Sequence, residues 1–372
     1  MIAPLLSISR RTRVTPFTPR VQAAGVAAYT VYNHMLLPTI FRSIEEDYWH
    51  LRQHVQIWDV AAERQVELRG PDAARLVQLM TPRDVSKAAV GQCLYVPIVD
   101  EAGGMLNDPV ALKLSADRFW LSIADSDLLL FAKGLAIGMR LDVTITEPEI
   151  WPLAVQGPKA LTLVARVFGE SVRDIRFFRF AVLPFERRNL VVARSGWSKQ
   201  GGFEIYLDDW DSGSALWDAL WQAGQDLEVA AGCPNLIERV EGGLLSYGND
   251  MTRANNPFEC GLDKYCHVDR DIDCIALAAL RQVKAAGPAR VIRGVKFGPN
   301  RCPPCVLPWP IASAGRPAGQ VSTAIWSPRF GCNVGFAMME RGYETPGTKI
   351  AIACADGVTR EGEVCLMPME GP

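Results

Sequence analysis

Apolar residues near the start of the chain recur at the spacing of a helix. The four residues that carry this pattern are Ile44, Tyr48, Leu51 and Val55. They predict an amphipathic helix over residues 44–56. Ser43 and Glu46 flank its first turn at the spacing of a capping box, in which each side chain bonds the other residue's backbone amide. His50 and His54 stand four residues apart on this helix, but no third metal ligand is evident, so a solvated or packing pair is the favoured interpretation.

A strand, a Gly-Pro turn and a helix follow, and the same order occurs twice. In the first copy, residues 64–69 alternate as a strand, Gly70-Pro71 forms the turn, and an apolar-periodic helix runs through about Met80. In the second copy, the parts are Leu153–Gln156, Gly157-Pro158 and a periodic segment through Phe168. Proline is favoured at the first helical position, so each helix is expected to begin there. A diverged duplication is compatible with this recurrence.

Most of the remaining chain is strand-like. Alternating runs occupy Cys93–Val99, Met105–Leu114, Phe119–Ala124 and much of Arg179–Leu207. A helix is predicted near residues 272–283, and a Pro/Gly-rich, strand-rich region begins at about residue 290. That region predicts a small all-β domain in the C-terminal part. The fold class is therefore α+β, built on antiparallel sheets.

Length and charge limit the function classes. A chain of 372 residues is expected to form two or three domains. Its formal net charge of −2 offers no basic field, so a nucleic-acid partner is not expected. The most apolar stretch, residues 119–141, is interrupted by charged residues, namely Asp125, Asp127, Lys133 and Arg140. We therefore expect no membrane-spanning segment.

Cysteine and histidine usage argues against a metal centre. The 10 cysteines are spread along the chain, unlike the dense framework of a small secreted domain, so reduced and mostly buried thiols are expected. Cys302 and Cys305 flank two prolines as in a redox or zinc half-site, but no second Cys/His pair lies at ligand spacing. With only 4 histidines, catalysis is expected to depend little on imidazole.

The start of the chain is basic. No acidic residue precedes Glu45, whereas several arginines do, among them Arg10, Arg11, Arg13 and Arg20. This bias is typical of an organelle transit peptide. A basic N-terminal arm of a cytosolic protein has the same composition and is the favoured interpretation, so a cytoplasmic location is expected.

One acidic residue is predicted among apolar neighbours. Alternation through residues 105–114 places Asp108 on the same strand face as Leu106, Val110, Leu112 and Leu114. An acid in such surroundings is expected to have a perturbed pKa, which is common in active sites. A structural aspartate bonded to backbone amides or to an arginine is the alternative.

Two further clusters carry polar residues. In the strand that ends at Leu207, Glu204 and Tyr206 share one face, opposite to Phe203, Ile205 and Leu207. The commoner outcome for such alternation is a solvent-facing pair. Residues 237–248 could form one charged helix with Arg239 near its start. No dinucleotide, P-loop or nucleophile-elbow motif is present, so the residues by themselves do not name a reaction.

Taken together, these clusters resemble the glycine-cleavage T-protein family of tetrahydrofolate enzymes. The matching segments are Gly103–Asp108, Gly201–Glu204, Glu238–Asp250 and Asn256–Glu259, in the same order. Three more segments resemble the branch of this family that demethylates dimethylsulfoniopropionate, namely Ser9–Phe17, Tyr29–Pro38 and Ser195–Tyr206. The similarity runs from about residue 8 to the end, which weakens the transit-peptide interpretation because the Arg-rich start lies within it.

The resemblance implies three domains in a cloverleaf around a central folate channel. Residues 1–58 and 146–270 would form a discontinuous folate-binding domain. Residues 59–145 would form a second domain, an antiparallel sheet with helices that carries Asp108. Residues 285–372 would form a C-terminal β-barrel or jelly-roll-like domain.

The resemblance also implies a role for individual residues. Asp108 matches the family's catalytic aspartate, near the folate nitrogen that receives the carbon. The residues implied to bind folate are Glu204, Arg239, Tyr95, Ser122 and Met35. Those implied to bind the methyl donor are Trp197, Tyr206, Lys199 and Tyr32, with Tyr206 also catalytic. The chain departs from the family pattern in two places, with Asn107 where T-proteins usually have a second acid, and without aromatic residues in Met367–Glu370.

The implied reaction fits the scarcity of histidine. A sulfonium methyl is already an activated electrophile, so the transfer needs alignment more than a metal or an acid. The expected products from dimethylsulfoniopropionate and tetrahydrofolate are 3-(methylthio)propanoate and 5-methyltetrahydrofolate, with Trp197 and Tyr206 holding the sulfonium by cation–π attraction. The alternatives are a family enzyme with an aminomethyl, N-methyl or O-methyl donor, and a non-catalytic folate-binding protein. The expected partners are these small molecules, and a homodimer remains open.

Overall fold

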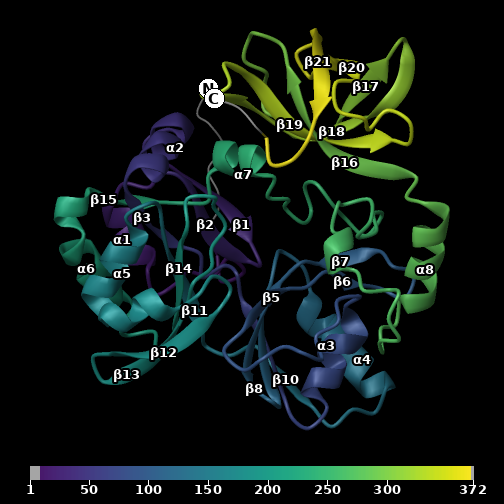
Figure 1. Ribbon diagram of the computed structural model, residues 1–372. Helices are drawn as coiled ribbons and strands as arrows, with labels where there is room; N and C mark the ends of the chain where they lie inside the picture. Colours follow the sequence, from purple (N-terminus) through teal and green to yellow (C-terminus); the bar gives the residue numbers. More distant parts are fainter. Residues whose placement is uncertain (1–8, 370–372) are drawn as a thin grey trace. The chain divides into compact units, whose positions relative to one another are not determined.

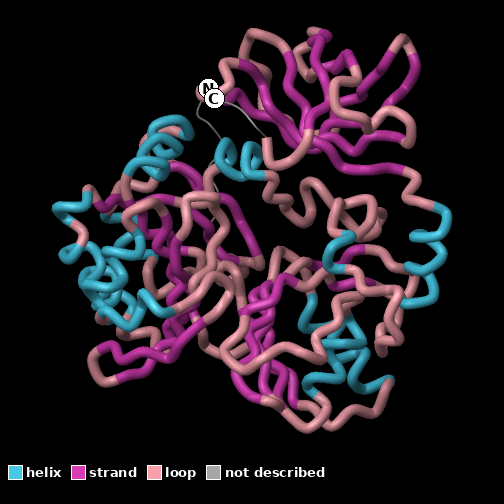
Figure 2. Tube along the Cα trace, in the orientation of Figure 1, coloured by secondary structure: helices cyan, strands magenta, loops and turns pink. Residues whose placement is uncertain are grey.

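The computed structural model describes residues 9–369 (Figure 1). The chain divides into two compact units. Unit 1 comprises the chain up to Gln65 together with Pro148–Gly196 and Gln200–Pro234. Unit 2 comprises Val66–Glu147, Trp197–Lys199 and the chain from Asn235 onward. Both units mix helices and strands (Figure 2), so the predicted α+β class is confirmed.

Unit 1 is built on a six-stranded sheet with the order β12-β13-β14-β11-β3-β15. Its strands are β3 Val55–Asp59, β11 Trp151–Gln156, β12 Phe180–Phe185, β13 Arg188–Ala193, β14 Gly202–Leu207 and β15 Val229–Gly232. All neighbours are antiparallel except β15 and β3, which are parallel. In this sheet, the expectation of antiparallel pairing therefore holds with one exception.

The predicted helix over residues 44–56 is shorter in the structure. Helix α2 spans Ile44–Gln53, and the Ser43 hydroxyl accepts the Glu46 amide as the capping box predicts. Val55 then begins β3, because it pairs with β15 while the strand also pairs with β11. Strand pairing on both sides of β3 satisfies the backbone N–H and C=O groups of Val55–Asp59. This pairing stabilises the strand more than the helical spacing of the apolar residues stabilises a longer helix.

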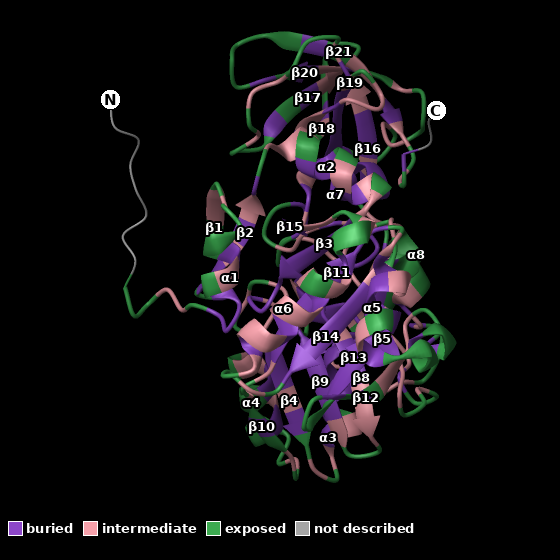
Figure 3. Cartoon of the chain, turned by 90° about the vertical axis from the view of Figure 1, so that its left-hand side faces the viewer, coloured by how far each residue is buried: buried purple, intermediate pink, exposed green. Residues whose placement is uncertain are grey.

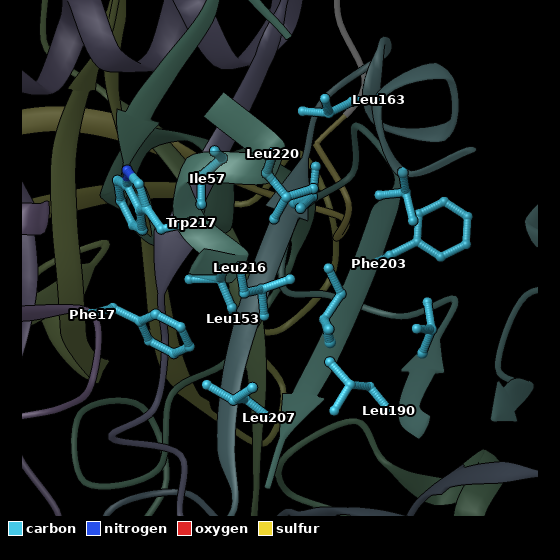
Figure 4. Close-up of a cluster of buried hydrophobic side chains, with 14 of the residues drawn as sticks. Phe17, Ile57, Leu153, Leu163, Leu190, Phe203, Leu207, Leu216, Trp217 and Leu220 are labelled. Atoms are coloured by element: carbon cyan, nitrogen blue, oxygen red, sulfur yellow. The ribbon is translucent and has the colours of Figure 1, made fainter. Parts of the chain in front are cut away.

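Helices cover the sheet of unit 1 and complete its core. The remaining elements of unit 1 are α1 Thr18–Ala23, β1 Ala28–Tyr32, β2 Met35–Ile40, α5 Ala160–Phe168, η1 Glu170–Asp174, α6 Gly213–Ala223 and η2 Gln225–Leu227. Figure 4 shows Phe203 and Leu207 of β14 with Leu153 of β11, and Leu216 and Trp217 of α6, in this core. In Figure 3, β11 and β14 are drawn largely in the colour of buried residues.

Unit 2 contains a five-stranded sheet with the order β10-β4-β9-β8-β5 and a separate two-stranded sheet, β6-β7. Its strands are β4 Gln65–Arg69, β5 Cys93–Tyr95, β6 Ile98–Val99, β7 Met105–Asn107, β8 Val110–Ser115, β9 Arg118–Ser122 and β10 Thr144–Thr146. Helices α3 Ala73–Met80 and α4 Leu128–Gly138 contribute to the apolar core beside the larger sheet.

The single strand predicted over residues 105–114 is wrong. The chain breaks at Asp108 and Pro109, so β7 pairs with β6, whereas β8 pairs with β5 and β9. Pro109 has no amide hydrogen to donate to a ladder, which favours a break at this position. Asp108 therefore does not share a strand face with the leucines and the valine that follow it.

Both Gly-Pro turns connect a strand to a helix, as predicted. Gly70 follows β4 with φ +144°, and Gly157 follows β11 with φ +123°. In each copy the amide three residues later, at Ala73 or Ala160, donates to the glycine carbonyl at 3.0 Å and the helix begins there. Each proline thus lies in the turn rather than at the first helical position.

The C-terminal part of unit 2 is a closed barrel with the strand order β16-β19-β18-β17-β20-β21. Its strands are β16 Arg290–Phe297, β17 Trp309–Ser313, β18 Arg316–Ser327, β19 Cys332–Glu340, β20 Lys349–Ala353 and β21 Thr359–Cys365. The predicted all-β region from about residue 290 is confirmed. The helix predicted near 272–283 instead spans Leu277–Ala286 as α8, and a short η3 helix precedes it at Asp263–Tyr265.

The charged helix predicted over residues 237–248 is also shorter than expected. Helix α7 spans Leu236–Gly242, and the next residue, Gly243, has a left-handed φ of +70°. The left-handed residue turns the chain back on itself, since glycine adopts this conformation without a steric penalty. Helix α7 contacts β18 and β19 of the barrel.

Two expectations about composition can be compared with the structure. No helix within residues 9–369 is long and apolar enough to cross a membrane. All ten cysteines lie in this range as free thiols, six of them buried, as the spread of cysteines predicted. The part of the N-terminal arm before Ser9 and the end of the tail, including Glu370, lie outside the described residues.

Candidate active site

Asp108 lies at the break between β7 and β8, and its neighbour Asn107 fixes the backbone there. The fully buried Asn107 side chain donates to the Ala124 carbonyl at 2.9 Å and to the Ser126 hydroxyl at 2.7 Å. Its oxygen accepts the amides of Ala124, at 3.0 Å, and of Asp108, at 2.9 Å. An ionised acid could not donate two of these bonds, so the amide of Asn107 suits the position where T-proteins usually carry a second acid.

The Asp108 carboxyl accepts a hydrogen bond from the Tyr95 hydroxyl at 2.8 Å. Burial raises the pKa of Asp108 to about 7, and the bond from Tyr95 offsets part of that rise, while Asp250 adds to it. The perturbation expected from the sequence is therefore present. Its largest cause is burial, and no arginine side chain among residues 9–369 bonds to the carboxyl.

Tyr95 and Ser122 belong to the same row of the five-stranded sheet. Val110 of β8 pairs with Tyr95 of β5 on one side and with Ser122 of β9 on the other. The Tyr95 ring packs against Tyr265 at 5.0 Å between centroids. Tyr95 and Ser122, predicted from the resemblance to bind folate, are thus brought to the strand that follows Asp108.

Arg239 of α7 is buried in a network of its own unit. Its Nη1 donates to Asp250 Oδ2 at 2.7 Å and to the Leu244 carbonyl at 3.2 Å, and its Nη2 donates to the Thr323 hydroxyl at 3.0 Å. The guanidinium carbon lies 5.8 Å from the ring centroid of Trp197 and 5.5 Å from that of Phe336. These contacts hold the guanidinium in one position.

The sequence interpretation assigned no role to Asp250. Had residues 237–248 formed one helix, Arg239 would lie near its start and Asp250 beyond its end, about three turns away, so the two side chains could not meet. Because α7 ends at Gly242 and the chain turns back, the two side chains form an ion pair that is almost fully buried. The opposite charges themselves were the only signal in the sequence.

In unit 1, Glu204 and Tyr206 are both buried, so the solvent-facing interpretation is wrong. Glu204 Oε2 accepts the Ser195 hydroxyl at 2.5 Å and the Tyr206 hydroxyl at 3.2 Å. Burial raises the pKa of Glu204, and these two bonds work against that rise. No described residue donates to Oε1, which leaves that oxygen as an acceptor for a ligand. The contact with Ser195 was not anticipated.

The other residues implied by the resemblance differ in exposure. Lys199 is exposed, and its backbone amide donates to Glu238 Oε1 at 3.0 Å. Tyr32 is partly buried and packs against the core of unit 1. Met35 is fully buried in that core, so a contact with folate would require its neighbours to move.

The two histidines of α2 lie close together and next to a lysine. Within residues 9–369, no group of three or more His, Cys, Asp or Glu side chains is arranged to hold a metal ion. His50 and His54 have ring centroids 4.9 Å apart, and burial lowers the pKa of His50 to about 4. His54 Nδ1 lies 3.0 Å from Lys159 Nζ, which describes a packing pair rather than a shared ligand set.

Comparison with known proteins identifies the family. A model of the GCVT N-terminal domain matches residues 17–270, and a model of the glycine cleavage T-protein C-terminal barrel domain matches residues 294–369. The chain therefore belongs to the glycine-cleavage T-protein family. Within this family, the dimethylsulfoniopropionate demethylase DmdA of Ruegeria pomeroyi is 58% identical over 95% of this chain and 98% of that protein.

More distant matches are aminomethyltransferases. An aminomethyltransferase of Symbiobacterium thermophilum is 29% identical over 85% of this chain and 86% of its own length. The crystal structure of the glycine cleavage system aminomethyltransferase T from Bartonella henselae matches with a TM-score of 0.85 at 21% identity, covering 96% of this chain and 97% of that chain. The TM-score shows that the two chains share the same fold.

Proposed function

We propose that this protein transfers a methyl group from dimethylsulfoniopropionate to N5 of tetrahydrofolate. The products are 3-(methylthio)propanoate and 5-methyltetrahydrofolate. The observation that carries this proposal is the Asp108 carboxyl, which is bonded to Tyr95 and has a pKa of about 7, in a chain that is 58% identical to a dimethylsulfoniopropionate demethylase. A carboxyl with such a pKa can exchange a proton near neutral pH.

The reaction is a direct displacement at carbon. The lone pair of N5 forms the new carbon–nitrogen bond as the carbon–sulfur bond breaks, and the electron pair of that bond stays on sulfur as a neutral thioether. N5 becomes a cation and then loses its proton. Nothing is oxidised or reduced, and the leaving group needs neither a metal nor a general acid. Catalysis therefore depends on aligning sulfur, methyl and N5.

Asp108 acts on the charge that develops at N5. In its ionised form the carboxylate stabilises the cation and then accepts the proton. A pKa of about 7 leaves a substantial ionised fraction at neutral pH while keeping the group basic enough to take a proton. The Tyr95 hydroxyl keeps the carboxylate oriented through its 2.8 Å hydrogen bond. Burial strengthens both effects, because the local dielectric constant is lower than in water.

The remaining predicted residues bind the two substrates in this proposal. Glu204 accepts hydrogen bonds from the pterin through Oε1, and Arg239 is a further folate-binding residue. Tyr95 and Ser122 are further folate contacts, and Met35 becomes one only if its buried neighbours move. Trp197 and Tyr206 hold the sulfonium, and Lys199 and Tyr32 contact the rest of the donor, with Lys199 suited to its carboxylate. Tyr206 also keeps Glu204 oriented through its hydroxyl.

Trp197 has Arg239 over its ring at 5.8 Å. A sulfonium held by the same tryptophan must therefore bind next to a fixed cation or on the other ring face. We further propose that the enzyme uses tetrahydrofolate as a co-substrate and needs no metal, because the thioether leaves without one. We also propose a cytoplasmic location.

Product analysis with a labelled donor tests this function. The purified protein is incubated with tetrahydrofolate and dimethylsulfoniopropionate carrying trideuterated S-methyl groups, and the products are identified by mass spectrometry. We expect one trideuteromethyl group on N5 for each molecule of 3-(methylthio)propanoate. Parallel incubations with N-methylglycine, a methoxy donor and an aminomethyl donor examine the other chemistries of the family. Turnover of one of these, with no label transferred from the sulfonium, would replace the proposal.

A further inference from the structure

Arg239 places a positive charge beside the ring proposed to bind a cation. Its guanidinium carbon is 5.8 Å from the Trp197 centroid and 5.5 Å from the Phe336 centroid, and its side chain is almost fully buried. Two like charges at such a range repel each other strongly where water is excluded. A sulfonium could use Trp197 only if the charge of Arg239 is compensated.

Asp250 supplies that compensation and is itself held by several donors. Its Oδ2 accepts Arg239 Nη1 at 2.7 Å and the Ser246 amide at 2.9 Å. Its Oδ1 accepts the hydroxyls of Thr323, at 2.6 Å, and Ser322, at 2.8 Å. The Asp250 side chain has no exposed surface. These four donors satisfy both oxygens of the buried carboxylate.

Thr323 links the two partners a second time. Its hydroxyl accepts Arg239 Nη2 at 3.0 Å and donates to Asp250 Oδ1 at 2.6 Å. The ion pair and this bridge hold the Arg239 guanidinium in one orientation. The hydroxyls of Ser322 and Thr323 on strand β18 of the barrel hold the Asp250 carboxylate. This network contains more hydrogen bonds than a single ion pair requires. The guanidinium that it holds lies beside the Trp197 ring.

We propose that Asp250 is a positioning residue that neutralises Arg239 and so allows a cationic methyl donor to bind at Trp197. This inference rests on the proposed methyl transfer from a sulfonium. Asp250 need not touch the substrate, because it acts through the charge and the position of Arg239. It therefore determines specificity for a cation over a neutral molecule of the same shape.

The same carboxylate also influences Asp108. Asp250 raises the pKa of Asp108, whose other titratable neighbours are Tyr95, Tyr247 and Cys260. Burial raises the pKa of each of these three groups, which keeps them neutral near pH 7. Loss of the Asp250 charge should therefore lower the pKa of Asp108, and the pH dependence of turnover gives a second readout.

The test compares a cation with its neutral isostere. 4-Methylpentanoate has the shape of dimethylsulfoniopropionate with a CH group in place of the sulfonium. The affinity of each compound is measured by titration calorimetry in the presence of 5-methyltetrahydrofolate, for the wild type and for Asp250→Asn. We expect the variant to lose about tenfold or more of the wild-type preference for the cation, with a smaller change for the isostere. Weakening of both compounds by the same factor would indicate a structural role alone and overturn the inference.

A paired variant separates charge from structure. Asp250→Asn combined with Arg239→Gln removes both charges, leaves no unpaired charge buried, and keeps the test available if the single variant does not fold. We expect the preference for the cation to return to within about threefold of the wild type. A double variant that still lacks the preference would show that Asp250 does not act by neutralising Arg239.

Two single variants serve as controls. Asp250→Glu keeps the charge and Ser322→Ala removes one hydrogen bond, and both should keep the cation preference and the pH midpoint of turnover. Asp250→Asn should move that midpoint to lower pH, and an unmoved midpoint counts against the inference. If the wild type neither binds nor demethylates the sulfonium, the proposed function fails. If it does both and Asp250→Asn retains the preference, only the role of Asp250 fails.

Discussion

The hydroxyl of Tyr95, at the end of β5, donates a 2.8 Å hydrogen bond to Oδ2 of Asp108, at the break between β7 and β8. Burial raises the pKa of both groups, so the tyrosine remains a donor near neutral pH while the carboxyl titrates there. The hydrogen bond favours the carboxylate and burial favours the neutral acid. Their balance places the pKa of Asp108 at about 7.

Replacement of Asp108 by Asn should slow methyl transfer while leaving folate bound. Asparagine keeps the shape and can still accept the bond from Tyr95, but it cannot take a proton from N5. We expect kcat to fall by roughly 10²–10⁴-fold and the Kd for tetrahydrofolate to change by less than about threefold. Single-turnover kinetics and fluorescence titration measure the two quantities. Asp127→Asn, at the exposed start of α4, is the matched control, and unchanged turnover in Asp108→Asn would remove Asp108 from the chemistry.

Replacement of Tyr95 by Phe should shift the pH dependence of turnover. The variant keeps the ring contact with Tyr265 but loses the hydrogen bond that lowers the pKa of Asp108. That pKa should rise, and because the ionised carboxylate is the active form, the rising limb of kcat/KM should move to higher pH by roughly half to one unit. If kcat/KM fell at every pH and the midpoint of its pH profile did not move, the Tyr95 hydrogen bond would not control the pKa of Asp108.

Replacement of Glu204 by Gln should weaken folate binding specifically. The Ser195 and Tyr206 hydroxyls both donate to Oε2, so the glutamine oxygen should take that place and its NH₂ group should take the place of Oε1. A donor would then face the N–H groups of the pterin. We expect the Kd for tetrahydrofolate to rise about tenfold or more, with little change in kcat at saturation. Glu149→Gln, exposed in the same unit, is the control, and equal affinities in the two variants would exclude the pterin contact.

The buried Asp59 should make the stability of the protein depend on pH. It accepts the Thr15 hydroxyl at 2.5 Å, and burial raises its pKa from 3.8 to about 7. The folded state therefore holds a proton that the unfolded chain has lost between about pH 4 and pH 7. The stability that protonated Asp59 contributes is complete below pH 4 and declines as the pH rises to 7.

Asp59→Asn removes this dependence because the amide does not ionise. The free energy of unfolding of the wild type, relative to the variant, should fall by on the order of 2–4 kcal/mol between pH 4 and pH 7. Chemical denaturation at several pH values measures the difference. The exposed Asp211→Asn serves as the control, and a wild-type curve parallel to that of Asp59→Asn would contradict the shifted pKa.

Much of the local structure could be predicted from the sequence. The capping residue Ser43 and the two Gly-Pro turns each depend on a few neighbouring residues, and the structure contains them. The alternation in β14 is also local, and its apolar members Phe203, Ile205 and Leu207 all join the core of unit 1. The family could also be predicted, because its motifs are short segments in a set order. These features are local, so the chain itself carries the information.

Tertiary structure decided the environment of the functional side chains. Alternation placed Glu204 and Tyr206 on one face but did not show that this face is buried. Val55 joined a strand because two other strands pair with it, and Asp108 lies at a break that assigns β7 and β8 to different sheets. Arg239 and Asp250 meet because α7 ends early.

The physical reason is the same in each case. Periodicity shows which side chains share a face of an element, whereas burial, hydrogen-bond partners and neighbouring charges come from residues far along the chain. The sequence by itself therefore determined the residue types of the candidate site and the family. Only the folded chain decided that Asp108 titrates near pH 7 and that Arg239 has a buried counter-charge.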